Sequence, residues 1–462
     1  MKACTLRPIL LLAYTVGILI PQLASCQDAE PLRTWKDSTG SFSIQATFLK
    51  LSGDLVILRR PDKQELTLPL SKLSKPDQQY ARQRQAELQR YLSAQQVPAG
   101  ANLAPIIAAA RNNSAIKLAA GTYHLRAQQP HQQGVLIEKK RGLIITGAGQ
   151  DKTTIKLAPD VDAGFLIGSD VEDLRIEHLH IEGTPPLKTN TAGIGSTSQC
   201  TGVRNVTLTN LKIDHVAVGI FVATGNGQVR DIKITNNRVS QTVGTEAGWG
   251  YGIHTRKVGN VLIAHNYIEH ATRHSIYVRE SPPRSSLVVE DNFILNHDLL
   301  GKNPRWYCAA LNCPSSHATT RIANNFFMNT NAVGIAVMTT ADDMSLVNNQ
   351  IIGEHYIGIW PVTGETHTAV GNSILLHAKP ANPKWSHKIN SFDWPNGKES
   401  NSQLSTPNPR WQQPDFVCQL NGSLYIMKDS SLDRIDPASW QFQTSPTKWS
   451  DVKGICSVTN VR

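Results

Sequence analysis

Histidine, arginine and tyrosine residues occupy matched positions of two consecutive repeats in the middle of the chain. His254 and Arg256 are followed 23 residues later by Tyr277 and Arg279. An arginine can neutralise the carboxylate of a uronic acid, which acidifies the C5 proton of the sugar, and a histidine or tyrosine can remove and return that proton. Residues of these types predict a polysaccharide lyase that acts by β-elimination.

Flanking cationic and aromatic residues complete the predicted site. The candidate catalytic residues are His254, Arg256, Tyr277 and His274, and the candidate substrate-binding residues are Lys257, Arg273, Arg279, Phe221, Trp360, Arg305 and Trp306. The aromatic residues have a second interpretation as cover for apolar surface. Two neighbouring arginines repel each other unless an anion lies between them or a carboxylate such as Glu280 or Glu246 intervenes.

A repeated phrase, asparagine followed by alternating apolar residues, indicates the fold that would bring these residues together. Its register marks are Asn210, Asn237, Asn266, Asn292, Asn325, Asn349 and Asn372. Two short strands per repeat cannot bury an apolar face alone, so neighbouring repeats must stack. We therefore predict a parallel β-helix in which asparagine side chains form a ladder along equivalent turns.

A second phrase, with Ile220, Ile253, Ile276, Ile335 and Ile359, sets the register of the side chains. If these isoleucines point inward, one outward column contains Phe221, His254, Tyr277, Ala336 and Trp360, and a second contains Ala223, Arg256, Arg279, Met338 and Val362. Stacked rungs lie about 4.8 Å apart, so His254 should lie beside Tyr277. His274 falls by the same alternation on the inward side with Tyr251, which favours a packed, hydrogen-bonded histidine at least as much as a catalyst.

The start of the repeats resembles a known fold. A short amphipathic helix over Leu103 to Ala110 is followed by SAIKLAAGTYHL, which resembles the entry to pectate-lyase-like right-handed β-helices. The resemblance implies that the helix plugs the open end of the solenoid. It also implies an acidic polysaccharide as partner, because several lyase families on this fold act on such polymers. The fold class predicted is all-β, with a right-handed parallel β-helix preceded by a small SH3-like β-barrel.

Two predicted regions precede the β-helix and one follows it. Residues 31–80 contain Arg33-Thr34-Trp35, Asp37, Gly40, Phe42 and Asp77-Gln78-Gln79-Tyr80, which resemble Sla1 homology domain 1 (SHD1), an SH3-like module. That resemblance implies a binding or spacer module with a possible protein partner. We predict a helical linker over 81–100, the β-helix over 101–379 and a C-terminal cap over 380–462.

The N-terminus has the layout of an export signal. Lys2 and Arg7 precede an apolar run from Ile9 to Ile20, which is too short for a stable membrane span. The following Leu23-Ala24-Ser25-Cys26 resembles the bacterial lipobox, in which the cysteine becomes the lipidated first residue, so the chain is either a lipoprotein anchored at Cys26 or is simply cleaved after its signal. We expect a periplasmic, cell-surface or extracellular protein that contacts a membrane only through a lipid anchor.

Cysteine usage agrees with export. Cys308 with Cys313, and Cys418 with Cys456, lie close enough in the chain for two local disulfides in an oxidising compartment. Cys200 is left over, and we expect a buried thiol rather than a nucleophile, because no histidine flanks it.

Charge and the remaining motifs narrow the alternatives. The chain has 46 Lys and Arg against 36 Asp and Glu, a net charge of +10, which suits an anionic partner. Nucleic acid has only this charge in its favour, and no cofactor or metal is expected, although calcium is possible at Asp170, Glu172 and Asp173. Asp342-Asp343 is a weak sign of a hydrolase. A hydrolase or epimerase on the same groove, or a non-catalytic cell-surface carbohydrate binder, remains open.

Overall fold

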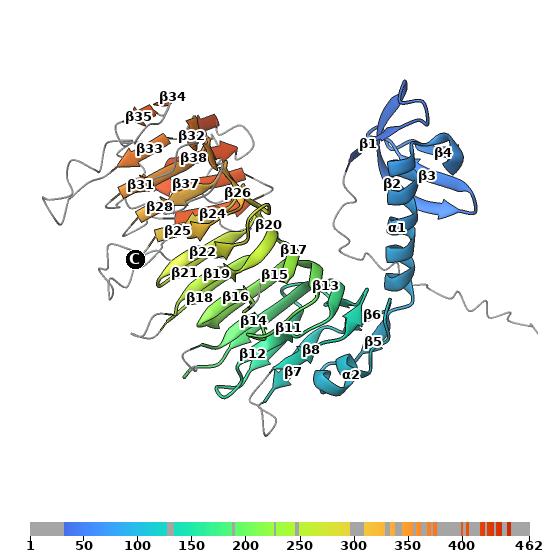
Figure 1. Cartoon of the computed structure of the whole chain (residues 1–462), viewed down its shortest axis with the longest axis horizontal. Helices are drawn as coiled ribbons and strands as arrows, with labels where there is room; N and C mark the ends of the chain where they lie inside the picture. Colours follow the sequence, from blue (N-terminus) through green and yellow to red (C-terminus); the bar gives the residue numbers. More distant parts are fainter. Residues whose placement is uncertain are drawn as a thin grey trace, which may run out of the picture.

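Short strands stacked in parallel make up most of the molecule (Figure 1). The computed structural model describes residues 32–126, 134–186, 190–225, 228–244, 249–295 and 309–328. Beyond these it describes the segments 333–337, 344–353, 357–361, 367–370, 373–376, 399–400, 403–405, 416–420, 423–428, 431–436 and 441–444. The predicted export signal with Cys26, the pair Arg305 and Trp306, and Cys308 and Cys456 lie outside the described residues.

Each complete coil contains three strands rather than the two predicted. The first strands of the coils form a sheet with nine described members: β8 (Val135–Ile137), β12 (Ala163–Ile167), β14 (Ala192–Ser196), β16 (Val218–Ala223), β19 (Tyr251–Arg256), β22 (His274–Ser281), β25 (Ala309–Ser316), β28 (Val333–Val337) and β31 (Ile357–Pro361). We call it the front sheet. All its neighbouring strands pair in parallel, and the sheet is therefore a stack of equivalent rungs.

Second and third strands continue each coil around the solenoid. The second strands are β6 (Ala115–Leu118), β9 (Lys140–Arg141), β10 (Ile144–Thr146), β17 (Val229–Thr235), β20 (Val258–Ala264), β23 (Ser286–Glu290), β26 (Thr319–Ala323), β29 (Met344–Val347), β32 (His367–Val370) and β34 (Glu399–Ser400). The third are β7 (Gly121–Leu125), β11 (Thr153–Leu157), β18 (Arg238–Thr242), β21 (Tyr267–Ala271), β24 (Phe293–Leu295), β27 (Phe326–Met328), β30 (Gln350–Gly353), β33 (Ser373–Leu376) and β35 (Gln403–Ser405). Two long strands, β13 (Val171–Gly183) and β15 (Val203–Val216), bend and serve both positions.

The predicted asparagine ladder is present, with one shift of register. The amide Nδ2 of Asn237 donates to Oδ1 of Asn266 at 3.0 Å, and the same bond recurs from Asn266 to Asn292, from Asn292 to Asn325 and from Asn325 to Asn349, at 2.9 to 3.0 Å. Asn210 was wrong as a register mark, because Leu211 occupies the ladder position and donates its backbone N–H to Asn237. Asn372 lies outside the described residues.

An apolar core runs along the solenoid and is closed at its first coil. Helix α2 (Leu103–Ala109) buries Leu103 and Ile107 completely in this core, as the plug prediction required. Each such side chain removed from water contributes about 2 kcal/mol, which favours docking of the helix over an exposed end. Just before the helix, β5 (Gln95–Val97) pairs with β6 and gives the first coil its edge.

The SHD1-like segment forms a four-stranded antiparallel sheet in the order β1 (Arg33–Lys36), β2 (Ser43–Ser52), β3 (Leu55–Arg59) and β4 (Glu65–Pro69). A short 3-10 helix (Leu70–Lys72) follows. Asp77 joins the two ends of the motif, since it accepts hydrogen bonds from the Arg33 guanidinium at 2.8 Å and from the Lys36 amide at 2.8 Å. Burial opposes ionisation of this carboxyl, but those bonds hold its pKa below the usual value.

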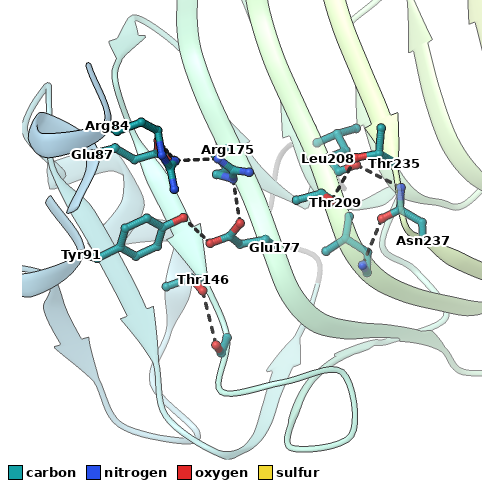
Figure 2. A network of polar contacts seen from close by, with 12 residues as sticks. Arg84, Glu87, Tyr91, Thr146, Arg175, Glu177, Leu208, Thr209, Thr235 and Asn237 are labelled. Atoms are coloured by element: carbon teal, nitrogen blue, oxygen red, sulfur yellow. Dashed lines mark hydrogen bonds and ion pairs between the residues drawn. The ribbon is translucent and has the colours of Figure 1, made fainter. Parts of the chain in front are cut away.

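Helix α1 (Lys75–Leu92) begins earlier than the predicted linker, because Ser74 caps it and the motif's Asp77 lies in its first turn. Its second half packs against the solenoid through a polar network (Figure 2). The Tyr91 hydroxyl donates to Glu177, and Arg175 bridges Glu87 at 2.6 Å and Glu177 at 2.7 Å. The helix therefore belongs to both parts of the molecule.

Strand pairing extends past residue 379, where we had placed the end of the β-helix, to β34 and β35. The chain then forms an antiparallel sheet of β36 (Phe416–Leu420), β37 (Ser423–Lys428), β38 (Ser431–Asp436) and β39 (Gln441–Thr444). Within the part of the chain that the structure describes, no helix combines the length and hydrophobicity needed to cross a membrane.

Candidate active site

The predicted outward columns are correct in register. Along the front sheet, His254 pairs with Phe221 on one side and with Tyr277 on the other. The column continues through Asn312, on a rung whose register we did not predict, to Ala336 and Trp360. For Trp360 the structure describes the strand position and not the side chain.

The second column is also confirmed where it is described. Arg256 pairs with Ala223 and with Arg279, and Arg279 pairs with Ser315 on the next rung. Met338 and Val362 lie outside the described residues.

Rings gather on the outer side of the front sheet, in a cluster separate from the solenoid core. Ring centroids of His254 lie 4.9 Å from Phe221, 5.0 Å from Tyr251 and 4.6 Å from Tyr277. We call this set the outer aromatic cluster; its members are Phe221, Trp249, Tyr251, His254, His274 and Tyr277. Trp249 was not predicted, although its place two residues before Tyr251 in the sequence Trp-Gly-Tyr could have indicated it.

Tyr251 and His274 belong to this outer cluster, so their predicted inward orientation is wrong. A Cβ at Gly252 would lie 2.7 Å from the core residue Ile268, which shows that Gly252 faces the interior, as the core residue Ile253 does. Two successive inward positions interrupt the alternation of the strand. Tyr251 therefore emerges on the same side as His254.

His254 is a buried imidazole without a hydrogen bond. It is 7% exposed, and neither ring nitrogen has a hydrogen-bond partner among the described residues. Burial, together with the positive charges of Arg279, Arg256 and Arg273, lowers its pKa to about 3. The ring is neutral at physiological pH, and the hydrogen-bonding capacity of its two buried nitrogens is unused among the described residues.

His274 has the opposite surroundings. It is 2% exposed, and Nδ1 lies 2.9 Å from the carbonyl oxygen and 3.0 Å from the backbone nitrogen of Ala309. Its Nε2 lies 3.3 Å from the side-chain amide of Asn312. These bonds tie one rung to the next, so His274 has the packed, hydrogen-bonded role that was the alternative to catalysis.

The two arginines of the second column share a carboxylate of the protein itself. Glu280 Oε1 lies 3.2 Å from Arg256 Nε and 2.9 Å from Arg279 Nε, and Lys257 Nζ lies 3.8 Å from Oε2. Burial works against the charge of Glu280, but the arginines hold its pKa below the usual value. With three cations and one carboxylate, the group of Arg256, Lys257, Arg279 and Glu280 has a net positive charge. Its side chains are also partly exposed.

Arg273 lies over the Tyr251 ring of the cluster, with its guanidinium carbon 5.4 Å from the ring centroid. A cation over an aromatic face is stabilised by the ring quadrupole. This places a further positive charge beside His254, in agreement with its lowered pKa.

Candidate metal ligands lie away from this cluster. Within the described residues, Glu182, Asp214 and His215 bring their ligand atoms within 4.8 Å of one another. Lys156 and Lys212 lie 3.7 and 3.8 Å from the two carboxylates, and these ammonium groups would repel a divalent cation.

Two of the three carboxylates considered for calcium bind side chains of the protein. Glu172 binds Arg141 and Arg204, and Asp173 accepts a hydrogen bond from Asn205. The carboxylates of Glu172 and Asp173 thus bind side chains of the protein itself.

Cys313 is a buried free thiol, so the predicted bridge to Cys308 is wrong. Its side chain belongs to the solenoid core, and burial raises its pKa to about 12. Cys200 is buried and free as expected. Cys418 lies in β36, where only the strand is described, and its predicted partner Cys456 is outside the described residues.

Two family descriptions match this chain. Residues 164–372 match "Right handed beta helix region", and residues 24–88 match "SLA1 homology domain 1, SHD1". The chain is a right-handed β-helix protein with an N-terminal SHD1 module. Among curated proteins, none matches it.

Solved β-helix structures resemble this β-helix protein remotely. The A-module of the Azotobacter vinelandii mannuronan C-5 epimerase AlgE4 is 13% identical, with a TM-score of 0.37 over 64% of this chain and 87% of that one. The AlgE6 A-module of the same organism is 14% identical, with a TM-score of 0.31 over 60% and 81%. A mutant of the PL6 family alginate lyase AlyGC is 12% identical, with a TM-score of 0.33 over 72% and 55%.

Proposed function

We propose that the outer face of the front sheet binds an acidic polysaccharide and cleaves it by β-elimination. The observation that carries the proposal is the neutral, buried imidazole of His254, whose nitrogens have no partner among the described residues and which lies next to a group of arginines. An unpaired buried polar atom costs about 1 to 3 kcal/mol, and a ligand that supplies the missing hydrogen bond recovers that cost.

The arginines supply the charge neutralisation that the reaction requires. Arg256 and Arg279 are partly exposed, and one carboxylate, Glu280, is shared between them. A uronate carboxylate placed against these guanidinium groups loses much of its negative charge. The C5–H bond next to that carboxylate then becomes acidic enough for a protein base to remove the proton.

The proton transfers use His254 and Tyr277. An imidazole nitrogen takes the C5 proton, the electron pair of the C5–H bond forms the C4=C5 double bond, and the C4–O4 bond breaks. The phenol of Tyr277 donates its proton to the departing O4. Both imidazole nitrogens are buried, and the rings of Phe221, Tyr251 and Tyr277 pack against the imidazole, so substrate binding must displace one of these rings before His254 can act.

The lowered pKa of His254 suits a base that must be neutral before substrate arrives. Without substrate, burial and three arginines disfavour the imidazolium. A bound carboxylate offsets the field of Arg279 and Arg256, and therefore raises the proton affinity of the ring when the proton has to be accepted. The anionic substrate thus activates its own base.

Polyuronate digestion tests the proposal. Cleavage by elimination should give products whose new C4=C5 bond absorbs in the ultraviolet, and His254→Gln and Tyr277→Phe should abolish this signal. A matched control is Lys233→Gln, an exposed position on β17 that leaves the front sheet unchanged. New reducing ends without the absorbance would indicate a hydrolase. Inversion at C5 without cleavage would indicate an epimerase, and binding without any product a non-catalytic binder.

The location of the protein and the partner of its SHD1 module are proposed from the sequence. The pattern of residues 1–26 supports export, with Cys26 as the candidate lipid attachment site. The SHD1 module supports a protein partner for the N-terminal sheet. Mass spectrometry of the mature protein would test the first point, since a lipidated N-terminal cysteine has a distinct mass.

A further inference from the structure

A second charged surface lies on the solenoid, along the turns that follow β8, β12, β14 and β16. Here the described residues enclose a groove of about 710 Å³. It is lined by Asn112, Lys139, Lys140, Arg141, Asp170, Glu172, Gly202, Val203, Arg204, Gln228 and Arg230. We call it the basic groove. None of the residues that line it belongs to the outer aromatic cluster.

Positive charge predominates in the basic groove. Five basic side chains face two carboxylates, which gives a net formal charge of +3. Glu172, in the middle, binds Arg204 at 2.7 Å and Arg141 Nε at 2.7 Å, and these bonds lower its pKa. Glu172 therefore stays ionised and holds the two arginines in place.

Other cations of the groove are not used in this way. Arg230 is 60% exposed, and its nearest carboxylate, that of Asp231, lies 3.7 Å away. Lys140 donates to two carbonyl oxygens at the end of helix α2, contacts that leave its positive charge uncompensated. An anion in the groove would meet this surplus charge.

Charged side chains follow one another in the basic groove at the spacing of the rungs. Arg141, Glu172, Arg204 and Arg230 occupy paired positions on four successive coils. Rungs are about 4.8 Å apart, so a ligand with charges repeated along its length can contact several coils at once. Gly202, which also lines the groove, has φ +66 and an added Cβ would lie 2.8 Å from Asp170 Oδ1, so this turn requires glycine.

We propose that the basic groove binds an extended acidic polysaccharide across the turns, through its carboxylate or sulfate groups. Single-stranded nucleic acid is disfavoured, because none of the described lining residues is aromatic and such ligands bind by stacking bases on aromatic rings. The proposal shares the acidic ligand of the proposed function but does not depend on cleavage. The same row of turns continues to Lys257, whose Nζ donates to Gly225 two residues after the end of β16.

Binding of the full chain to polygalacturonate, to a sulfated glycan and to neutral dextran tests the groove. The variant Lys139→Glu with Arg230→Glu reverses two charges without touching Glu172. Its Kd for the preferred acidic glycan should rise at least about tenfold, since two attractions become repulsions. The matched control, Arg59→Glu with Arg60→Glu, makes the same charge change on the exposed SHD1 sheet and should bind as wild type.

The outcomes separate this proposal from the proposed function. Tighter binding to polygalacturonate identifies carboxylate as the ligand group, and tighter binding to the sulfated glycan identifies sulfate. Wild-type affinity of the groove variant, or tighter binding of single-stranded DNA than of either acidic glycan, overturns the proposal. Loss of acidic-glycan binding in the groove variant, together with absence of cleavage by wild type, supports the groove and refutes only the elimination.

Discussion

The ring centroids of His254 and Tyr277 lie 4.6 Å apart on adjacent rungs of the front sheet, although the residues are 23 positions apart in the chain. The imidazole has no hydrogen-bond partner among the described residues, and the tyrosine ring covers it. Two groups suited to proton transfer are therefore held together by the stacking of coils. This arrangement carries a cost in stability that mutagenesis can measure.

Replacing His254 should separate stability from activity. In His254→Phe two unsatisfied buried nitrogens disappear while the ring contacts remain, so the free energy of unfolding should rise by about 1 to 3 kcal/mol. Elimination activity should be lost. The matched variant is His274→Phe, which leaves the backbone of Ala309 and the amide of Asn312 without their partner and should lower stability by a similar amount. Urea unfolding of both variants measures the difference; equal destabilisation would refute the contrast.

The free energy of unfolding of the wild type should decrease as the pH is lowered, because of His254. Its folded pKa of about 3 lies below the usual 6.5, so the unfolded chain binds the proton first as the pH is lowered. The stability contribution is complete above pH 6.5 and is lost as the pH falls toward 3. Between pH 7 and pH 5 the wild type should lose about 2 kcal/mol more than His254→Phe. Urea titrations of both proteins at several pH values test this, and parallel curves would contradict it.

Removing the charge of Glu280 should strengthen the binding of anions. In Glu280→Gln the guanidinium groups of Arg256 and Arg279 lose their shared carboxylate, and affinity for a polyuronate should rise by about threefold at low salt. Arg279→Gln should have the opposite effect. Isothermal titration calorimetry measures both changes. Weaker binding by Glu280→Gln would mean that the carboxylate is needed to orient the arginines.

The asparagine ladder should be a major source of stability. Asn292 accepts from the backbone and side chain of Asn266 and donates to Ile263 and Asn325, at 2.8 to 3.0 Å. Asn292→Ala removes these four bonds and leaves the buried backbone N–H of Asn266 without its acceptor, so the loss should be at least about 3 kcal/mol. The control Lys233→Ala, on an exposed strand position, should change stability by less than about 0.5 kcal/mol. Denaturant unfolding compares the two.

The columns of the site were predictable because alternation along a strand and stacking of rungs are local rules. Given that Ile253 and Ile276 face the core, His254 and Tyr277 had to lie side by side on the outside. The rule failed at Gly252, where two successive residues face inward and Tyr251 turns outward. A glycine makes such a departure possible, but the sequence does not show whether the chain uses it.

Interactions between distant turns could not be predicted in the same way. The sequence offered Glu280 and Glu246 equally as partners for the arginines, and only the fold shows that Glu280 contacts both. The shift from Asn210 to Leu211 in the ladder has a similar cause, because a one-residue change of register leaves the repeated phrase almost unaltered. Cys313 was assigned to a disulfide from proximity to Cys308 alone, and its core position was not visible.

Helix α1 makes contacts at both of its ends. Asp77 in its first turn accepts from Arg33 of the SHD1 sheet. In its second half, Glu87 binds Arg175 of the solenoid and Tyr91 donates to Glu177 (Figure 2). A single rigid rod of 18 residues thus replaces a flexible tether. Any molecule captured by the SHD1 sheet is consequently held at a set distance and heading from the first coil, and both parts should tumble in solution with one rotational correlation time.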